Sequence, residues 1–466
     1  MQAAGEQHNS FDLSALPSVD LVLSESADLI AKFGRSSVVD AARKALDKLR
    51  SELLAGEHSS ATRIDLFSIA HERVRSALDS DRSARLRRVI NATGVVIHTN
   101  LGRAPLSENA VNSLVEVARG YSNLEYDVAA GVRGKRGADV ESLICTLIGA
   151  EAAIIVNNCA AAAFFVLSAF AAGREVIVSR GELVEIGGDF RVPDVLERSG
   201  ATLHEVGTTN RTKAADYAKA IGDATKMILR VHPSNYRIVG FTAAPSLDEL
   251  VTVAGENNVV LFEDIGSGAV ADVAAYGVND EPSPRESIKA GVDIVAFSGD
   301  KLLGGPQSGI IAGRSELIDK LRKHPLYRAL RVDKLTLAAL GATLEPYVRG
   351  TETEEVPVIK MLAITADDIR SRAAQLVESL AGNASLQLEI IEGNSAIGGG
   401  SAPTSHPETW LISVSKPNTS ADSLAARLRQ NDPPIITRIE NDRVLIDLRT
   451  VSHQDEAELV DALRSV

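Results

Sequence analysis

Seven short apolar segments alternate with helix-like segments between residues 150 and 315, and this alternation constrains the fold most. The apolar segments are continuous, which is typical of strands buried on both faces of a parallel sheet. Helix-like stretches lie between several of them, at 158–171, 214–221 and 246–256. We therefore predict an α/β fold with a mostly parallel sheet. Its strands are expected at 153–156, 174–179, 201–207, 226–232, 258–263, 292–298 and 309–313.

The regions on either side of this sheet follow other patterns. Before it, apolar residues recur every three or four positions from Val39 to Leu53, which indicates one face of a helix. After it, a long helical run over 361–381 precedes an α+β pattern, and the glycines at 398–400 indicate a flexible loop. Later elements are expected at 386–391, 409–415, 420–430 and 453–464, with a hairpin around Asn441-Asp442. We expect a helical module over 1–65, a linker and N-terminal segment over 66–110, a large α/β domain over 111–335 and a C-terminal α+β domain over 336–466.

Composition excludes several classes of protein. The chain is 45% hydrophobic and 24% charged, which rules out wholesale disorder, and no stretch approaches the ~18 apolar residues of a membrane helix. Its two cysteines, Cys145 and Cys159, cannot form a disulfide framework, which fits a reducing cytosol and argues against a Cys-rich zinc site.

The net charge of −13 argues against indiscriminate nucleic-acid binding. Residues 31–50 nevertheless hold six basic side chains against Asp40 and Asp47. A basic binding face and an ordinary solvated helix face both explain this excess. The six residues are Lys32, Arg35, Arg43, Lys44, Lys48 and Arg50.

Polar residues of the types used in catalysis and ligand binding follow the ends of several predicted strands. Lys301 comes three residues after the strand 292–298, and Asp264 directly follows the strand 258–263. Ser234 and Asn235 follow a third strand. Taken singly, each has an ordinary explanation as a loop lysine, a turn cap or a turn residue. Because parallel strands bring their carboxyl ends to one edge, where ligands bind, we expect these residues to meet there.

Together these residues match the needs of pyridoxal phosphate (PLP). Its aldehyde needs a lysine, its pyridine nitrogen a carboxylate, its phenolic oxygen a donor and its phosphate a helix N-terminus with a hydroxyl. Cys159 is either a small residue at a tight helix start or an activated thiolate. The expected ligands are Lys301 for the aldehyde, Asp264 for the nitrogen, Asn235 with Ser234 for the phenolic oxygen, and Ser298, Asn158, Cys159 and Ala160 for the phosphate.

Long strings of the sequence resemble the bacterial selenocysteine synthase family, the L-seryl-tRNA(Sec) selenium transferases. The resemblance runs from about residue 12 to the C-terminus, with one departure at Cys159, where a polar residue, commonly Asn, is expected. The strings include RRVINATGVVIHTNLGRAPLSENAV (87–111), SNLEYDVAAGVRGKRG (122–137), VHPSNYRIVGFT (231–242), EDIGSGA (263–269), FSGDKLLGGPQSGII (297–311) and RALRVDKLTLAAL (328–340).

This resemblance implies a fold-type I, aminotransferase-like PLP enzyme that converts L-seryl-tRNA(Sec) to L-selenocysteinyl-tRNA(Sec). Selenophosphate supplies the selenium, and an aminoacrylyl intermediate forms on the cofactor. Lys301 moves the proton at Cα, and Asp300 beside it orients the lysine. The family also implies that the N-terminal module binds tRNA(Sec) and that the protein forms a ring-shaped homodecamer built from dimers.

The resemblance assigns arginines to the anionic substrates. Arg103, Arg328 and Arg331 are expected to bind selenophosphate, the last two from one side of a helix because of their i, i+3 spacing. Arg133 and Arg136 belong to a basic, glycine-rich loop over 131–137. That loop either holds the tRNA 3′ end or gates the site, and some arginines act across a dimer interface.

Two other functions remain open. The first is a PLP-dependent lyase or desulfurase acting on a free amino acid, which would not need the N-terminal module. The second is a catalytically idle tRNA-binding homologue, against which the presence of Lys301, Asp264 and Ser298 argues.

Overall fold

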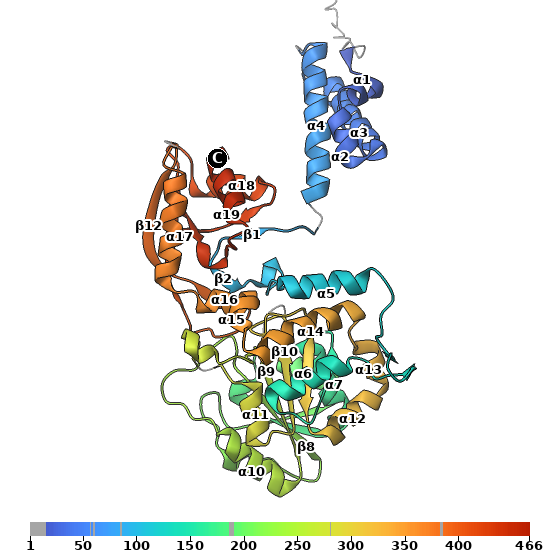
Figure 1. The fold of residues 1–466 in the computed structure, drawn as a ribbon, viewed down its shortest axis with the longest axis vertical. Coiled ribbons are helices and arrows are strands. Elements are labelled where there is room, and N and C mark those ends of the chain that lie inside the picture. The colour runs from blue at the N-terminus through green and yellow to red at the C-terminus, as the bar shows by residue number, and fades with distance from the viewer. Residues whose placement is uncertain are drawn as a thin grey trace, which may run out of the picture. The chain divides into compact units, whose positions relative to one another are not determined.

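The computed structural model describes residues 15–466 apart from 56, 59–60, 84–85, 186–190, 280 and 383–384. The chain divides into two compact units, Met1–Arg88 and Val89–Val466, each with its own core (Figure 1). Among the described residues, no helix is long and apolar enough to cross a membrane.

The first unit consists of helices packed around one apolar core. Leu46 and Leu49 of α3 are buried against Leu66 and Val74 of α4. The expected boundary at residue 65 is therefore wrong, because the apolar stripe of α4 completes this core, and the unit extends to residue 88. Its helices are α1 (Val19–Ser24), α2 (Ala27–Phe33), α3 (Arg35–Leu54) and α4 (Arg63–Ser83).

The second unit is built on a seven-stranded sheet in the order β5-β11-β10-β9-β8-β6-β7. All seven predicted strands are confirmed. The sheet is parallel except for β11, which runs antiparallel to both of its neighbours. The strands are β5 (Ala152–Val156), β6 (Glu175–Ser179), β7 (Thr202–Val206), β8 (Thr225–Val231), β9 (Val260–Gly266), β10 (Ile294–Ser298) and β11 (Gly309–Gly313).

Helices cover both faces of this sheet (Figure 1), which explains why its strands are apolar throughout. α14 buries Leu337, Leu340 and Leu344 on one face, so the expected domain boundary at 335/336 is wrong: this helix belongs to the large domain. That face carries α6 (Ala138–Ile148), α9 (Ala214–Ala220), α10 (Leu247–Asn257), α11 (Pro284–Ala290) and α14 (Lys334–Arg349). The other face carries α7 (Cys159–Ala171), α8 (Val192–Arg198), α12 (Ser315–Lys323) and α13 (Pro325–Leu330).

The C-terminal part is an antiparallel sheet in the order β12-β14-β17-β16, with helices packed on one face. The expected helix over 361–381 is two helices, because Thr365 caps the second one with its side chain. The hairpin turns at Asn441 and Asp442, both left-handed, as predicted. The elements are α15 (Glu352–Glu355), α16 (Pro357–Ala363), α17 (Ala366–Ser379), β12 (Gln387–Asn394), β14 (Glu408–Ser415), α18 (Ala421–Gln430), β16 (Arg438–Glu440), β17 (Arg443–Asp447) and α19 (Glu456–Ser465).

The segment expected as a linker joins the C-terminal part through short parallel strand pairs. β1 (Ile90–Asn91) pairs with β15 (Ile435–Ile436), and β2 (Val95–Ile97) pairs with β13 (Ala396–Gly398). The glycine loop after β13 is packed, because a Cβ on Gly399 would lie 2.4 Å from Ile97 Cγ2. From β2 the chain continues through α5 (Glu108–Ala118) and a hairpin of β3 (Tyr126–Asp127) and β4 (Val132–Arg133).

Candidate active site

The carboxyl ends of β8, β9 and β10 lie side by side, because these strands are neighbours in the sheet. The register pairs Val231 with Asp264, and Asp264 with Ala296. The turn after β10 then places Lys301 next to Asp264: a Cβ on Gly266 would lie 3.8 Å from the lysine Nζ. Lys301 is buried, and no hydrogen bond of its amine is found among the described residues. The strand-end residues thus meet at one edge, as the sequence predicts.

Asp264 is held from the opposite side by the start of α7. The thiol of Cys159 donates to Asp264, with Sγ 3.3 Å from Oδ1. Burial raises the pKa of Asp264 to about 6, against the lowering effects of the Cys159 hydrogen bond and of the positive charge of Lys301. Any further cation or proton donor placed next to this carboxylate therefore stabilises its charged form.

Cys159 is a hydrogen-bond donor and not an activated thiolate. Burial, together with the negative charge of Asp264, raises its pKa well above the ordinary value. The raised pKa thus argues against the interpretation of Cys159 as a reactive thiolate. These two effects outweigh the favourable position at a helix N-terminus.

The N-terminus of α7 forms an anion site beside these residues. Asn158 caps the helix, and its Oδ1 accepts from the N–H of Ala161 at 2.8 Å. The N–H groups of Cys159 and Ala160 find no acceptor among the described residues, as expected for a first helical turn. Ser298, buried at the end of β10, lies beside the Cys159 thiol. These groups suit a phosphate.

Asp300 binds Arg103 rather than its neighbour Lys301. Arg103 Nη1 lies 2.7 Å from Asp300 Oδ2, and no hydrogen bond between Asp300 and Lys301 is present in the described part of the chain. Arg103 follows β2 and has a left-handed backbone with φ 64°. The structure thus brings Arg103 to the turn that carries the lysine. The orienting role expected of Asp300 stays a prediction.

Ser234 and Asn235 differ in their surroundings. Ser234 is buried, whereas Asn235 is exposed and its Nδ2 donates to the carbonyl of Glu185 at 2.7 Å. The packed glycine loop reaches this place, since a Cβ on Gly400 would lie 3.8 Å from Asn235 Cβ and 3.9 Å from Ser234 Oγ. The amide expected to bind the phenolic oxygen is thus engaged by the backbone, and its cofactor contact stays a prediction.

The arginines expected to bind anions fall into two groups. Arg133, Arg136 and Arg331 surround Glu125, whereas Arg328 is exposed and has no ion pair among the described residues. The expectation that Arg328 and Arg331 share a helix face is wrong. α13 ends at Leu330, and Arg331 is extended because its backbone pairs with Val156.

Sequence reasoning missed His232 and Glu281. His232 follows β8, and its backbone N–H donates to the carbonyl of Asp264 at 3.0 Å. Its Nε2 lies 3.6 Å from Glu281 Oε1, and Glu281 in turn accepts from the N–H of Ala402 after the glycine loop. The histidine before Pro233 at a strand end was a usable signal. Glu281 lies in a loop, and no sequence pattern indicates it.

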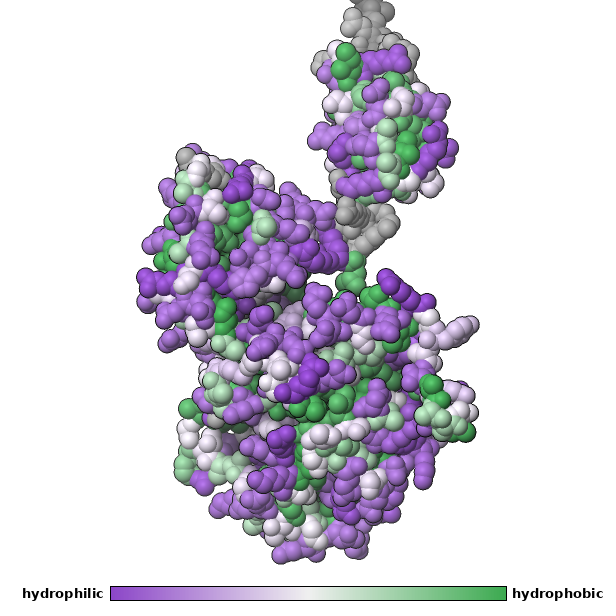
Figure 2. All heavy atoms as spheres, viewed as in Figure 1, coloured by the Kyte–Doolittle hydropathy of each residue, from purple (hydrophilic) through white to green (hydrophobic). Residues whose placement is uncertain are grey.

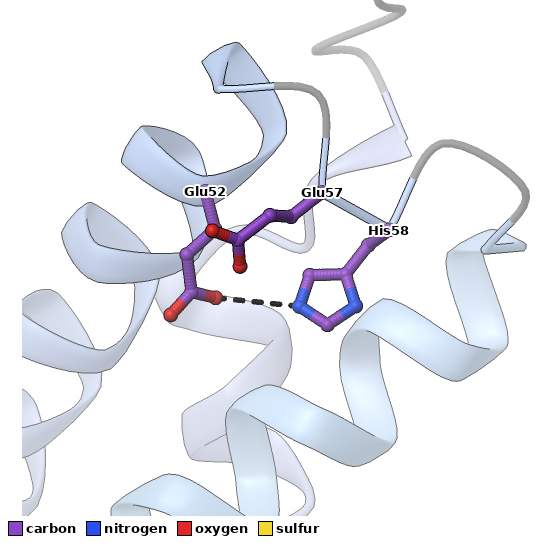
Figure 3. A group of neighbouring side chains, drawn as sticks. All are labelled: Glu52, Glu57 and His58. Carbon is purple, nitrogen blue, oxygen red and sulfur yellow. Dashed lines mark ion pairs between the residues drawn. The ribbon is translucent and has the colours of Figure 1, made fainter.

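A separate cluster in the first unit has the composition of a metal site. Glu52, Glu57 and His58 lie close enough to share an ion (Figure 3). Glu52 Oε2, however, lies 2.8 Å from Arg73 Nη1 and 3.4 Å from His58 Nε2. Because Arg73 already balances the carboxylate, we interpret the cluster as an ion-pair junction between the end of α3 and α4.

The sequence of this chain matches known proteins over nearly its whole length. Residues 89–452 match the family described as L-seryl-tRNA selenium transferase, and residues 13–50 match selenocysteine synthase N terminal. The L-seryl-tRNA(Sec) selenium transferase of Hyphomonas neptunium is 47% identical over 457 residues, covering 97% of this chain and 98% of that protein. That of Alkaliphilus metalliredigens is 48% identical over 460 residues, again covering 97% and 98%.

A solved structure of D-glucosaminate-6-phosphate ammonia-lyase covers 82% of this chain and 95% of its own, with a TM-score of 0.57 and 23% identity. This likeness concerns the fold. The predicted α/β architecture of fold-type I enzymes is confirmed. Since one family matches from Val89 to residue 452 and relatives align over nearly their whole length, this chain belongs to the L-seryl-tRNA selenium transferase family.

Proposed function

We propose that this chain converts L-seryl-tRNA(Sec) to L-selenocysteinyl-tRNA(Sec), with selenophosphate as the selenium donor and PLP held by Lys301. One observation carries the proposal. In a chain of this family, a buried lysine without a hydrogen-bond partner in the described residues stands beside the carboxylate of Asp264 at the ligand-binding edge of the sheet.

The residues at this edge fit PLP. The amine of Lys301 is free to bind an aldehyde. Burial raises the pKa of Asp264, and a protonated pyridine nitrogen beside it would stabilise the charged carboxylate. The first N–H groups of α7 suit a phosphate group. When bound, PLP supplies a conjugated ring that takes up negative charge from the Cα of the seryl group.

The side chains of the site have separate roles in the proposed reaction. Lys301 holds the cofactor, takes the proton from Cα and returns it there at the end. Asp264 keeps the proton on the pyridine nitrogen, and Cys159 fixes the orientation of Asp264 through its hydrogen bond. Arg103, Arg328 and Arg331 supply the positive charge that selenophosphate requires.

The first unit binds the body of the tRNA. Arg43, Lys44, Lys48 and Arg50 are exposed on α3, and only Arg50 has an ion-pair partner among the described residues, Asp47 at 3.8 Å. These charges are therefore available to phosphates. Shape and phosphate contacts of this kind distinguish one tRNA body from another far from the aminoacylated end.

A homo-oligomer, and specifically a homodecamer built from dimers, stays our expectation for the assembly. Exposed apolar side chains on the hairpin of β3 and β4 support association with another chain (Figure 2). Tyr126, Val128 and Val132 are 51%, 71% and 57% exposed. We place the reaction in the cytosol, where aminoacyl-tRNAs are used.

One experiment tests this function directly. The enzyme with its cofactor is mixed in turn with seryl-tRNA(Sec), serine and cysteine, and the visible absorbance of the cofactor is followed. We expect a change with seryl-tRNA(Sec) alone. A change with free serine or cysteine, and none with the charged tRNA, would point to a lyase or desulfurase. No change with any of them would point to an idle homologue.

A further inference from the structure

The carboxylate of Glu125 is surrounded by three guanidinium groups. Its Oε1 lies 3.1 Å from Arg136 Nη1 and 3.2 Å from Arg331 Nη1, and its Oε2 lies 3.0 Å from Arg133 Nη2. These arginines, Arg136 most strongly, lower the pKa of Glu125, so it is charged at neutral pH. One negative charge therefore faces three positive charges, and the cluster keeps a surplus of two.

Arg136 has a second side-chain partner besides Glu125, and Arg331 is fixed through its backbone. Arg136 Nη2 also donates to the carbonyl of Val332 at 2.5 Å, and the backbone of Arg331 pairs with Val156. Glu125 lies in the loop between α5 and β3, and its side chain has several rotatable bonds. Its side chain is 28% exposed and that of Arg331 is 29% exposed. An incoming ion can therefore reach the pair, and the carboxylate is the member that is free to swing away.

The backbone of Arg331 adjoins the phosphate site at the start of α7. Arg331 pairs with Val156, the last residue of β5, and the next residue, Asn157, donates its N–H to the carbonyl of Leu330. Asn158 then caps α7. The backbone that carries Arg331 is thus fixed beside the strand-end site. This location favours a small substrate over the tRNA backbone as the ligand of the cluster.

We propose that Glu125 is an internal counter-ion that occupies Arg331 until an oxyanion of the phosphate class displaces it, and that it thereby sets the anion affinity of the cluster. This proposal rests on the proposed function, in which Arg331 binds selenophosphate. A carboxylate and a phosphate-type oxyanion use the same paired N–H groups of a guanidinium, so they compete. Glu125 is thus a positioning residue, which acts on the reaction through Arg331.

Calorimetric titration of inorganic phosphate into the cofactor-loaded enzyme tests the competition. Glu125→Gln removes the competing charge and should tighten phosphate binding about tenfold, the effect of losing one charge-assisted contact. Arg331→Ala should weaken phosphate binding and cancel the gain in the double variant. Glu205→Gln is the matched control: it breaks the pair of Glu205 with Arg180, changes the net charge equally and should leave phosphate affinity unchanged.

The outcomes separate this inference from the proposed function. If Glu125→Gln binds phosphate with unchanged or lower affinity, Glu125 only supports the loop and the inference fails. If Arg331→Ala nevertheless slows selenium transfer, the proposed function stands and only the inference about Glu125 fails. If Arg331→Ala changes neither phosphate binding nor selenium transfer, the anion role of Arg331 fails, and the inference fails with it. Should Glu125→Gln not fold, Glu125→Asp keeps the charge, withdraws it from Arg331 and should give a smaller gain in affinity.

Discussion

Arg103 Nη1 lies 2.7 Å from Asp300 Oδ2, although 197 residues separate the two in the chain. The contact ties the segment after β2 to the turn that carries Lys301. Asp300 is buried, whereas the side chain of Arg103 is 37% exposed. The arginine is thus reached from solvent on one side and neutralises a buried charge on the other. It holds the lysine turn, and we expect its exposed side to bind an anionic substrate.

A double-mutant cycle measures this coupling. Arg103→Ala leaves the buried carboxylate of Asp300 without its partner. The loss of unfolding free energy caused by Arg103→Ala should therefore be larger in the wild-type protein than in the Asp300→Asn variant. We expect a coupling of about 1–3 kcal/mol from urea unfolding of the cofactor-loaded enzyme. Additive effects on unfolding would mean that Arg103 serves only the substrate.

Lys301 should carry the cofactor. It is the buried lysine beside Asp264, so borohydride reduction followed by peptide mapping should place the adduct on it. Lys301→Ala should lose the covalent adduct. Lys334→Ala is a suitable control, because Lys334 donates to the carbonyls of Val117 and Gly120 and lies in α14. An adduct mapped to another lysine in the wild-type protein would contradict the site.

Asp264 should make the cofactor-free protein less stable as pH rises. Its pKa is about 6 in the folded protein against an ordinary 3.8, so between these values the folded state binds a proton that the unfolded chain has lost. Stability therefore falls across this window, and the loss is complete above it. Because each pKa unit corresponds to about 1.4 kcal/mol, we expect a loss of about 2–3 kcal/mol.

The variant Asp264→Asn provides the test. At pH 8 the cofactor-free variant should resist urea better than the wild type, whereas near pH 4 the two should be similar. With PLP bound the variant should be almost inactive, because the pyridine nitrogen loses its counter-charge. Identical pH profiles of unfolding would show that Asp264 is not destabilised by burial. Normal turnover would show that another group protonates the ring.

The strand-end site could be predicted because it depends on local patterns. Continuous apolar strands fix the sheet, and a parallel sheet brings Asp264 and Lys301 to one edge wherever the intervening loops run. The contacts of Glu125 and Asp300 could not be predicted, because they join loops distant in sequence. Arg331 shows why periodicity alone is insufficient. Its i, i+3 spacing suggests a helix, but pairing with Val156 makes it extended.

Arg331→Ala and Arg328→Ala should impair selenium delivery more than loss of the serine hydroxyl. Each removes a charge-assisted contact, which is worth about 1.5–3 kcal/mol or roughly 10–150-fold in affinity. Single-turnover assays separate the two half-reactions: the cofactor spectrum reports the first, and radioactive selenium in the tRNA reports the second. Equal losses in both half-reactions would indicate a role in folding or in tRNA binding.

The first unit should recognise tRNA(Sec), and the structure shows where to cut. Deletion of residues 1–65 would divide the core that α3 shares with α4, so the appropriate deletion is 1–88. That deletion should leave the PLP spectrum intact and weaken tRNA(Sec) binding. If the module instead serves packing or assembly, oligomeric state or PLP retention would change first. Full tRNA(Sec) affinity with continued rejection of tRNA(Ser) would move recognition to the 131–137 loop.

Charge on α3 should account for part of this binding. Neutralising Arg43, Lys44, Lys48 and Arg50 together should weaken tRNA(Sec) binding and lower the slope of log K against log salt by up to about 3, since each phosphate contact contributes roughly 0.7–0.9. A control that neutralises four exposed lysines of the second unit changes the net charge equally and should leave that slope nearly unchanged. Equal effects of the two variants would mean that the net charge of the protein, and not a basic face on α3, governs the attraction. The control residues are Lys219, Lys226, Lys289 and Lys320.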